Sequence, residues 1–356
     1  MPAILTESRA ETAKVLLERL LDESQEGSSI FRGQGFVGWD LVPSAWRPNS
    51  LQALRSRIDE KLGSMWSLEL PGDTQLDHAT LTEKYIGNSG PDSMIRLRDL
   101  VVGLTAERQI VREFCEGCDR VALAVPGFDD NRSLSPIVDV SVLSGADISA
   151  AGSKALTPAF PTTVTYAFAQ HMGLPTRLLD FSDSPFKAAY FAATSAYQKP
   201  PVKLRGHDFV VWVAKPPRLD SDLALAAALM GSDVRQFRVL RSQISYLHAQ
   251  DGLFIDCNAS SNRFYLDNGR WPSMADVMHG WTLEKIRVPT EQAAETLQRL
   301  ERMGVSNITM RPSYEGVASA IVRQHLPKPQ GSGFSMMMFV GDEVVSPAVQ
   351  DTSRGT

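Results

Sequence analysis

The chain has 356 residues, of which 43% are hydrophobic and 22% are charged, and its net charge is −5 at pH 7. This length suggests one large domain or two unequal ones, and the composition is that of a globular protein. The acidic balance excludes a general basic surface for nucleic acid, although it is compatible with a local basic groove.

Neither a targeting segment nor a membrane span is expected. Acidic residues, beginning at Glu7, interrupt the N-terminal stretch before any apolar run can form, which is unlike a signal peptide. The longest apolar stretch, residues 334–340, is far shorter than the ~20 residues that cross a bilayer. The sequence therefore predicts a cytoplasmic protein with no membrane partner.

The three cysteines are too few, and odd in number, for a secreted disulfide scaffold. Cys115 and Cys118 have a CxxC spacing, but no further thiol or imidazole ligand lies nearby to complete a zinc site. The pair also falls inside a helical pattern, whereas a redox pair normally opens a helix after a strand. Ordinary helix residues are the favoured interpretation, and no metal is expected.

The first half of the chain predicts helices separated by irregular segments. Apolar residues recur at helical spacing in residues 10–24, with Glu and Arg between them. The other expected elements of this half are a short strand at 29–33, a proline-punctuated loop at 41–48, irregular structure or an insertion at 51–95, a strong helix at 95–121 and a long surface excursion at 126–160.

The second half predicts strands with helices between them. Pro185 suits the first position of a helix over 186–197, whose small apolar residues indicate burial. The other helices are expected at 163–171, 290–303 and 314–324. Strands are expected at 176–180, 208–214, 244–248, 253–257, 283–288, 305–310 and 336–345. This alternation indicates an α+β fold.

The first candidate for chemistry is the segment Phe31-Arg32-Gly33-Gln34, at the end of a strand. The guanidinium of Arg32 offers a planar fork of donors for a carboxylate or a phosphate. Gly33 would allow a ligand to approach the backbone, and Gln34 adds a donor and an acceptor. An arginine that ties this loop to a nearby acid explains the segment equally well.

A second candidate lies in residues 169–192, where polar residues gather among apolar neighbours. The cluster consists of Gln170, His171, Thr176, Arg177, Asp180, Ser182, Asp183 and Ser184. Buried polar groups need partners, so an internal network is the alternative, with Arg177 paired to Asp180 and either Ser182 or Asp183 capping the following helix. A structural histidine is favoured at His171.

A third segment, residues 242–254, contains Gln250 and Asp251 beside Gly252. A hairpin turn explains Asp-Gly by itself. The chain contains no GxSxG elbow, no P-loop and no GxGxxG turn.

These segments together resemble the FRG domain, which is named for its Phe/Tyr-Arg-Gly start. The resemblance rests on FRGQ at 31–34, on LVPS and Arg47 after it, on ERQIVREF at 107–114 and, above all, on QHMGLPTRLLDFSDSPFKAAYFA at 170–192. AQDGLF at 249–254 and IRVP at 286–289 add to it. It implies an FRG domain over 29–326 with insertions near 51–95 and 126–160, an N-terminal helix in 1–28, and a strand and polar tail in 327–356.

A more distant resemblance connects the chain with ADP-ribosyltransferases. Many of these begin with a strand bearing Tyr-Arg-Gly, whose arginine holds an NAD phosphate, and continue with a small polar strand that leads into an A-x-x-F-A helix. Residues 30–33 and 176–180 are similar to these strands, in the same order. The resemblance implies a split mixed or antiparallel sheet with surrounding helices. The glutamate usual on a late strand has no clear counterpart at 243–254, where Gln243, Gln250 or Asp251 would have to serve.

The resemblance implies an NAD-utilising transferase of the glycosyltransferase class, such as a bacterial toxin or phage-defence effector that modifies a protein or nucleic acid. NAD would be its substrate, and an antitoxin or other protein its partner. The implied catalytic residues are Arg32, Asp180, Gln250 and Asp251. The implied NAD-binding residues are Phe31, Arg32, Gly33, Gln34, Ser44, Arg47, Gln170, His171, Thr176, Arg177 and Ser182. An NAD hydrolase, a nucleotide sensor and a non-catalytic protein- or nucleic-acid-recognition module are the alternatives.

Overall fold

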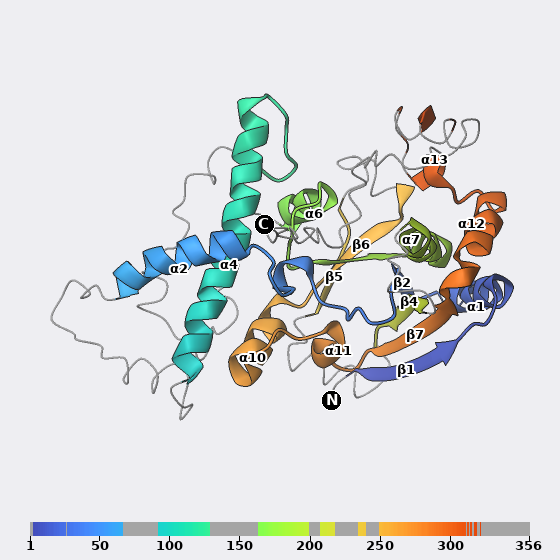
Figure 1. Cartoon of the computed structure of the whole chain (residues 1–356), viewed down its shortest axis with the longest axis horizontal. Coiled ribbons are helices and arrows are strands. Elements are labelled where there is room, and N and C mark those ends of the chain that lie inside the picture. Colours follow the sequence, from blue (N-terminus) through green and yellow to red (C-terminus); the bar gives the residue numbers. More distant parts are fainter. Residues whose placement is uncertain are drawn as a thin grey trace, which may run out of the picture.

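The computed structural model describes residues 3–25, 27–66, 92–128, 163–198, 207–217, 234–239 and 249–310, together with positions 312, 314, 317, 318 and 321. These residues form a seven-stranded mixed sheet with helices around it, so the α+β class is confirmed (Figure 1). None of the described helices is both long enough and apolar enough to cross a membrane.

The strands lie in the order β1-β7-β4-β2-β3-β6-β5. Their bounds are β1 Ile4–Arg9, β2 Ile30–Gln34, β3 Leu179–Ser182, β4 Asp208–Lys215, β5 Arg235–Phe237, β6 Gly252–Asp256 and β7 Thr282–Pro289. Only β1 and β7 are parallel among these pairs, and all the others are antiparallel. Strands β2 and β4 share a five-pair register, whereas β2 and β3 share only the pair Phe31↔Ser182. Strands β2 and β3 are therefore neighbours joined by a single residue pair.

One face of the sheet is covered by α1 (Ala13–Gln25), α7 (Pro185–Gln198) and α12 (Ala293–Arg302), which pack together in Figure 1. Small residues of α7 allow close approach to β2. A Cβ atom on Gly33 would clash with the carbonyl of Ala188 and lie 2.7 Å from the nitrogen of Ala192. Only glycine fits this crossing, because the atoms in the way belong to the helix backbone.

The opposite face carries a second core, in which Ile30, Trp212 and Leu283 pack with residues of α11 (Met274–Val277). The remaining helices are α2 (Gln52–Trp66), α4 (Asp92–Arg120), α6 (Thr163–His171), α10 (Asn258–Asn268) and α13 (Asn307–Met310), with short 3-10 turns η1 (Ser44–Trp46) and η3 (Thr290–Gln292). Helices α2 and α4 lie to the left of the sheet in Figure 1, and α4 packs against α10.

Several sequence predictions are confirmed. The helix at 163–171 has the predicted bounds, and the helices expected at 10–24, 95–121, 186–197 and 290–303 are present with small shifts, as are the strands expected at 29–33, 208–214, 253–257 and 283–288. Pro185 begins α7, whose alanines at 188, 189, 192 and 193 are buried.

Other predictions are wrong. Residues 52–66, expected to be irregular, form α2, a run dominated by good helix formers. Residues 307–310, expected in a strand, form α13, because Ser306 and Thr309 exchange backbone and side-chain hydrogen bonds as in a helix cap. The strand predicted at 176–180 begins only at Leu179. Strand β1, within the segment interpreted as an N-terminal helix, was not predicted.

Some predictions fall outside the described residues. These are the excursion at 129–160, the strands at 244–248 and 336–345, and the last residues of the chain. Within the expected helix at 314–324, the described positions 314, 317, 318 and 321 are helical.

Candidate functional site

Arg32 of β2 and Asp180 of β3 form an ion pair close to the single β2–β3 residue pair. Nη1 of Arg32 lies 2.6 Å from Oδ1 of Asp180 and also donates to the Asp180 backbone carbonyl at 2.7 Å. The arginine side chain is only 6% exposed, whereas that of Asp180 is 60% exposed. A buried guanidinium thus links β2 to β3 and holds a carboxylate at the surface.

Gln170, the penultimate residue of α6, holds the same carboxylate from another direction. Its Nε2 donates to Oδ1 of Asp180 at 3.0 Å, and its Oε1 accepts from the hydroxyl of Thr176. The nitrogen of Thr176 donates to Oγ of Ser44 at 3.1 Å, and the carbonyl of Thr176 accepts from the nitrogen of Ala45 at 3.1 Å. This network fastens η1 and α6 to the residues that precede β3.

The direction of the hydrogen bonds in this network is fixed by the carboxylate of Asp180, which when ionised can only accept. Gln170 therefore presents Nε2 to Oδ1 of Asp180, so its Oε1 accepts from the hydroxyl of Thr176. Oγ1 of Thr176 also accepts from the nitrogen of Leu178 at 3.3 Å. Oδ1 of Asp180 thus receives two donors, one from Arg32 and one from Gln170.

The charge state of Asp180 follows from its surroundings. Desolvation opposes ionisation, but the charge and hydrogen bond of Arg32 outweigh it, and Arg47 adds a further attraction. The pKa of Asp180 therefore lies below its ordinary value. Asp180 is a carboxylate at neutral pH, beside two arginines.

Arg47 belongs to this site through the loop that carries η1. It is the C-terminal cap of η1, and its Nε donates to the carbonyl of Val42 at 3.2 Å. Its side chain is half-buried. The structure thus brings together six of the predicted residues: Arg32, Ser44, Arg47, Gln170, Thr176 and Asp180.

Arg177 does not form the expected pair with Asp180. Its backbone nitrogen donates to Oε1 of Glu107 at 2.6 Å, its Nε donates to Oε2 at 2.9 Å, and Nη2 lies 2.8 Å from Oε2. Both side chains are at most 5% exposed, and the guanidinium lies over the ring of Tyr166. Desolvation would lower the pKa of Arg177, but the charge of Glu107 outweighs it and raises that pKa. Arg177 is thus a buried structural residue in this arrangement, and sequence analysis did not identify Glu107 as its partner.

Ser182, Gln250 and Asp251 form a separate group at the start of α7. Oγ of Ser182 donates to the carbonyl of Gln250 at 2.8 Å, and the carboxylate of Asp251 pairs with Lys187 of α7 at 2.6 Å. Asp251 adopts a left-handed φ of 46°. The side chain of Asp251 is directed to α7, and the structure does not join it to the Arg32–Asp180 pair.

The cap of α7 is also different from the one expected. Oγ of Ser184 accepts from the nitrogen of Lys187 at 3.4 Å, as an N-cap does. Asp183 instead binds Arg238 through both carboxylate oxygens, at 2.6 and 3.0 Å. Ser182 accepts from the nitrogen of Ser184 at 3.0 Å, just before the helix.

The other predicted residues lie apart from the Arg32–Asp180 pair or inside the core. Phe31 packs under α7, and Gly33 gives α7 its close approach, so its missing side chain serves packing. Gln34 accepts from the indole nitrogen of Trp212 at 2.7 Å and is 2% exposed. His171 ends α6 and is half-buried.

The cysteines and the acidic residues offer no metal cluster within the described part of the chain. Cys115 and Cys118 lie on α4, as the helical pattern predicted, and are free thiols. Burial raises the pKa of Cys115 to about 12, so this thiol is not suited to act as a nucleophile at neutral pH.

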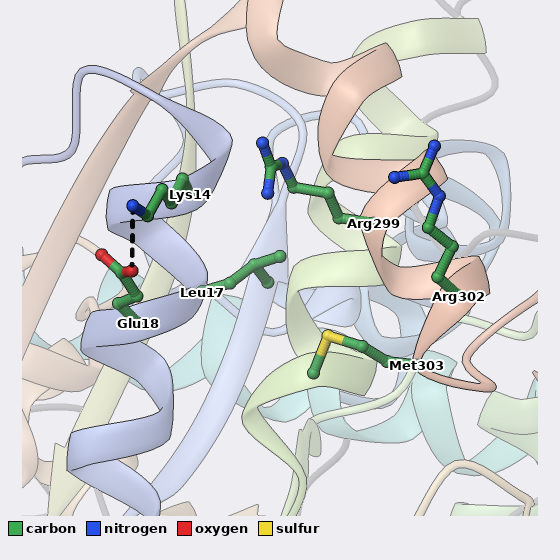
Figure 2. A pocket seen from close by; sticks show the side chains of 6 residues that line it. All are labelled: Lys14, Leu17, Glu18, Arg299, Arg302 and Met303. Carbon is green, nitrogen blue, oxygen red and sulfur yellow. Dashed lines mark ion pairs between the residues drawn. The ribbon is translucent and has the colours of Figure 1, made fainter.

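A surface hollow of about 300 Å³ lies between α1 and the end of α12. Figure 2 shows Lys14, Leu17 and Glu18 of α1 on one side of the hollow and Arg299, Arg302 and Met303 on the other. Lys14 pairs with Glu18 at 3.6 Å, one turn along the same helix. None of the predicted site residues lines this hollow.

Comparison with known families supports the FRG resemblance. Residues 146–200 match the FRG domain model. The described part of this segment contains α6, β3 and α7, and with them Gln170, Thr176 and Asp180. No curated protein and no solved structure matches the chain.

Proposed function

We propose that the protein is an NAD-utilising transferase of the ADP-ribosyl type, with its site at the Arg32–Asp180 pair. The observation that carries the proposal is the adjacency of β2, β3 and β6, with the Arg32–Asp180 pair joining β2 to β3. These strands follow one another along the chain in the order in which the distant resemblance expects its two strand motifs and its late strand. Gln170 holds Asp180 from α6, and Thr176 connects Gln170 to Ser44 of η1.

Asp180 is the group best placed for this chemistry. In the proposed reaction, the bond from C1′ of the ribose to nicotinamide breaks, and nicotinamide leaves with the bonding electrons. An acceptor oxygen or nitrogen then forms a bond to C1′ and loses its proton. The sugar becomes cation-like between these steps, and a fixed carboxylate stabilises that charge because its geometry is already set by Arg32 and Gln170.

NAD labelled in its adenylate phosphate tests the proposal. The full chain is incubated with labelled NAD and with a lysate of protein and RNA, beside Asp180→Asn and the surface variant Arg57→Ala. We expect label on a macromolecule with the wild-type chain and with Arg57→Ala, and loss of transfer with Asp180→Asn. Labelling that is equal in all three would overturn the role of Asp180, and NAD that neither binds nor reacts would overturn the function. Transfer of label to a protein or nucleic acid would fit an effector of a toxin or phage-defence system.

A second candidate, NAD hydrolysis or nucleotide sensing, is favoured by one observation. Residues 249–256 contain no glutamate, and the nearest acid before β6, Asp251, is bound to Lys187. A site without a group to orient an acceptor would release ADP-ribose to water or only bind the nucleotide. Free labelled ADP-ribose without a labelled macromolecule identifies the hydrolase, and binding of intact NAD identifies the sensor.

A further inference from the structure

We propose that two copies of the chain associate through strand β1, which pairs antiparallel with β1 of the second copy about a two-fold axis at Thr6. Strand β1 is separated from β2, the strand of Arg32, by β7 and β4. The inference therefore concerns another surface and does not rest on the proposed function. It joins the two sheets into one continuous sheet.

Strand β1 is a long edge strand of the sheet. It pairs with β7 over six consecutive residues, from Ile4↔Thr282 to Arg9↔Arg287. Among the strands that the structure describes, none lies beyond it, and Figure 1 shows it at the lower border of the sheet. The opposite edge strand, β5, has only three residues. Edges are commonly protected by shortening, by a proline or by a bulge, whereas β1 is regular and contains no proline.

The backbone of β1 has hydrogen-bonding groups that point away from β7. The nitrogens of Ile4 and Ala10 donate to backbone carbonyls on the β7 side, both at 2.8 Å. Alternate residues of a parallel strand bond to the same neighbour, so the even-numbered residues of β1 face β7. The N–H and C=O groups of the odd-numbered residues therefore point to the open side, at Leu5, Glu7 and Arg9. No backbone hydrogen bond connects these groups to another described residue, and an extended strand would satisfy them.

The side chains of β1 favour burial of its first half. Ile4 and Leu5 are 60% and 56% exposed, although both belong to the regular part of the strand. The two charged residues already have partners, since Glu7 binds Arg287 at 2.9 Å and Arg9 lies 3.6 and 3.7 Å from two acids. A second strand at this edge thus covers apolar side chains and does not need to neutralise a charge.

The strand is complementary to itself in one register. Because the odd-numbered residues face outward, each must oppose an odd-numbered residue of the second copy. Two antiparallel registers meet this condition and keep most of β1 paired, one centred on Glu7 and the other on Thr6. The first places Glu7 opposite the same residue of the second copy, where like charges are destabilising. The second opposes Thr6 to Thr6, a favourable hydroxyl pair, Leu5 to Glu7 and Ile4 to Ser8.

This self-complementarity identifies a second copy as the partner. The two-fold arrangement uses the same edge of both copies, so association stops at two chains and leaves neither β1 edge exposed. It also covers the exposed side chains of Ile4 and Leu5 in each copy at once.

Sedimentation equilibrium on the full chain, over a range of concentrations, measures the association. We expect a reversible equilibrium between monomer and dimer, and at least tenfold weaker association for Leu5→Pro. Proline at this position removes an outward N–H but no bond to β7, so the fold should be retained, which circular dichroism checks. Ile95→Ala removes an exposed apolar side chain from α4 and should associate like the wild type. A wild-type chain that is monomeric at every concentration, or a folded Leu5→Pro variant that associates equally well, would overturn the proposal.

Oxidative cross-linking tests the register in a Cys118→Ser background, since the other two cysteines are buried. Thr6→Cys should form a disulfide between the copies, because residues in a non-hydrogen-bonded antiparallel pair have Cα atoms about 4.5 Å apart, within disulfide range. Ile4→Cys is the control. It opposes Ser8 of the second copy, so its two thiols are offset by four residues, or roughly 13 Å, and should not join. Equal cross-linking of the two variants, or none for Thr6→Cys in a dimeric sample, would overturn the pairing of β1 with β1.

Discussion

Arg177, two residues before β3, forms a buried ion pair with Glu107 in the middle of α4, seventy residues away along the chain. Both oxygens of Glu107 accept from Arg177, and the backbone nitrogen of Arg177 is one of the donors. This pair joins the long helix to the strand that carries Asp180. The position of Asp180 therefore depends in part on the Arg177–Glu107 ion pair, which lies outside the candidate site.

Removal of the acid should destabilise the protein strongly. Glu107→Ala leaves the buried guanidinium of Arg177 without a counter-charge, which we expect to cost about 3–5 kcal/mol of unfolding free energy. The matched control is Glu116→Ala on the same helix, which removes a partly exposed i,i+4 pair with Arg112 and should cost at most about 0.5 kcal/mol. Chemical denaturation of both variants measures the difference, and equal midpoints would contradict the structural role of Glu107.

Alanine substitutions at two glycines, one of them a control, test the close approach of α7 to β2. Gly33→Ala places a Cβ against the carbonyl of Ala188 and 2.7 Å from the nitrogen of Ala192, so backbone must move. We expect a loss of about 3 kcal/mol. Gly117→Ala, inside α4 and with only Arg120 nearby at 3.8 Å, should instead gain about 0.5–1 kcal/mol from helix propensity. Thermal melting distinguishes the two, and a Gly33→Ala variant as stable as wild type would refute the packing argument.

The sequence predicted elements well where their signals are local. The helix at 163–171 has the predicted bounds because its apolar pattern is followed closely by Gly173, at φ 92°. The burial of α7 followed from its small residues, and its first residue from Pro185. The segments around Arg32 and Asp180 were also selected from local composition, and the structure brings these two residues into contact.

Long-range contacts account for most of what the sequence did not predict. Thr176 and Arg177 have strand-forming neighbours, but their hydrogen bonds go to Ser44 and Glu107, so β3 starts later than its composition suggests. Strand β1 is a largely exposed edge strand that pairs with β7, near the other end of the described chain, and its sequence has no alternating apolar pattern. The partner of Asp180 could not be chosen from sequence, since Arg32 and Arg177 were both available.

The hydrogen-bond network behind Asp180 can be interrupted without changing side-chain volume. Thr176→Val removes the hydroxyl that donates to the amide oxygen of Gln170, and leaves the Leu178 nitrogen without that acceptor. We expect a loss of about 1–3 kcal/mol of stability, together with weaker nucleotide binding. Thr296→Val is the control, because Thr296 is equally buried but its hydroxyl donates to the carbonyl of Gln292, just before α12 and away from Asp180. It should leave nucleotide binding unchanged, and an equal effect of both variants on binding would count against the network.

The lowered pKa of Asp180 leads to a prediction about the pH dependence of stability. The pKa of Asp180 is lower in the folded protein than its ordinary value, so the unfolded chain binds more protons in the interval between the two values. Stability from the Arg32 contact is therefore fully present above the unfolded pKa of about 3.9. It is lost as the pH falls through the lower folded value. Asp180→Asn cannot titrate, so the stability difference between the wild-type chain and this variant should be largest at neutral pH and shrink in acid.

Denaturant unfolding from neutral pH to about pH 2.5, across the ordinary aspartate pKa, measures this difference. The side chain of Asp180 is 60% exposed, so water and salt screen the contact and the effect should decrease at high ionic strength. Arg32→Ala provides the control background. If Arg32 is the cause of the lowered pKa, Asp180→Asn should have little pH-dependent effect on stability once Arg32 has been removed. A wild-type difference that stays constant with pH, or one that persists unchanged in the Arg32→Ala background, would show that Arg32 does not set the ionisation of Asp180.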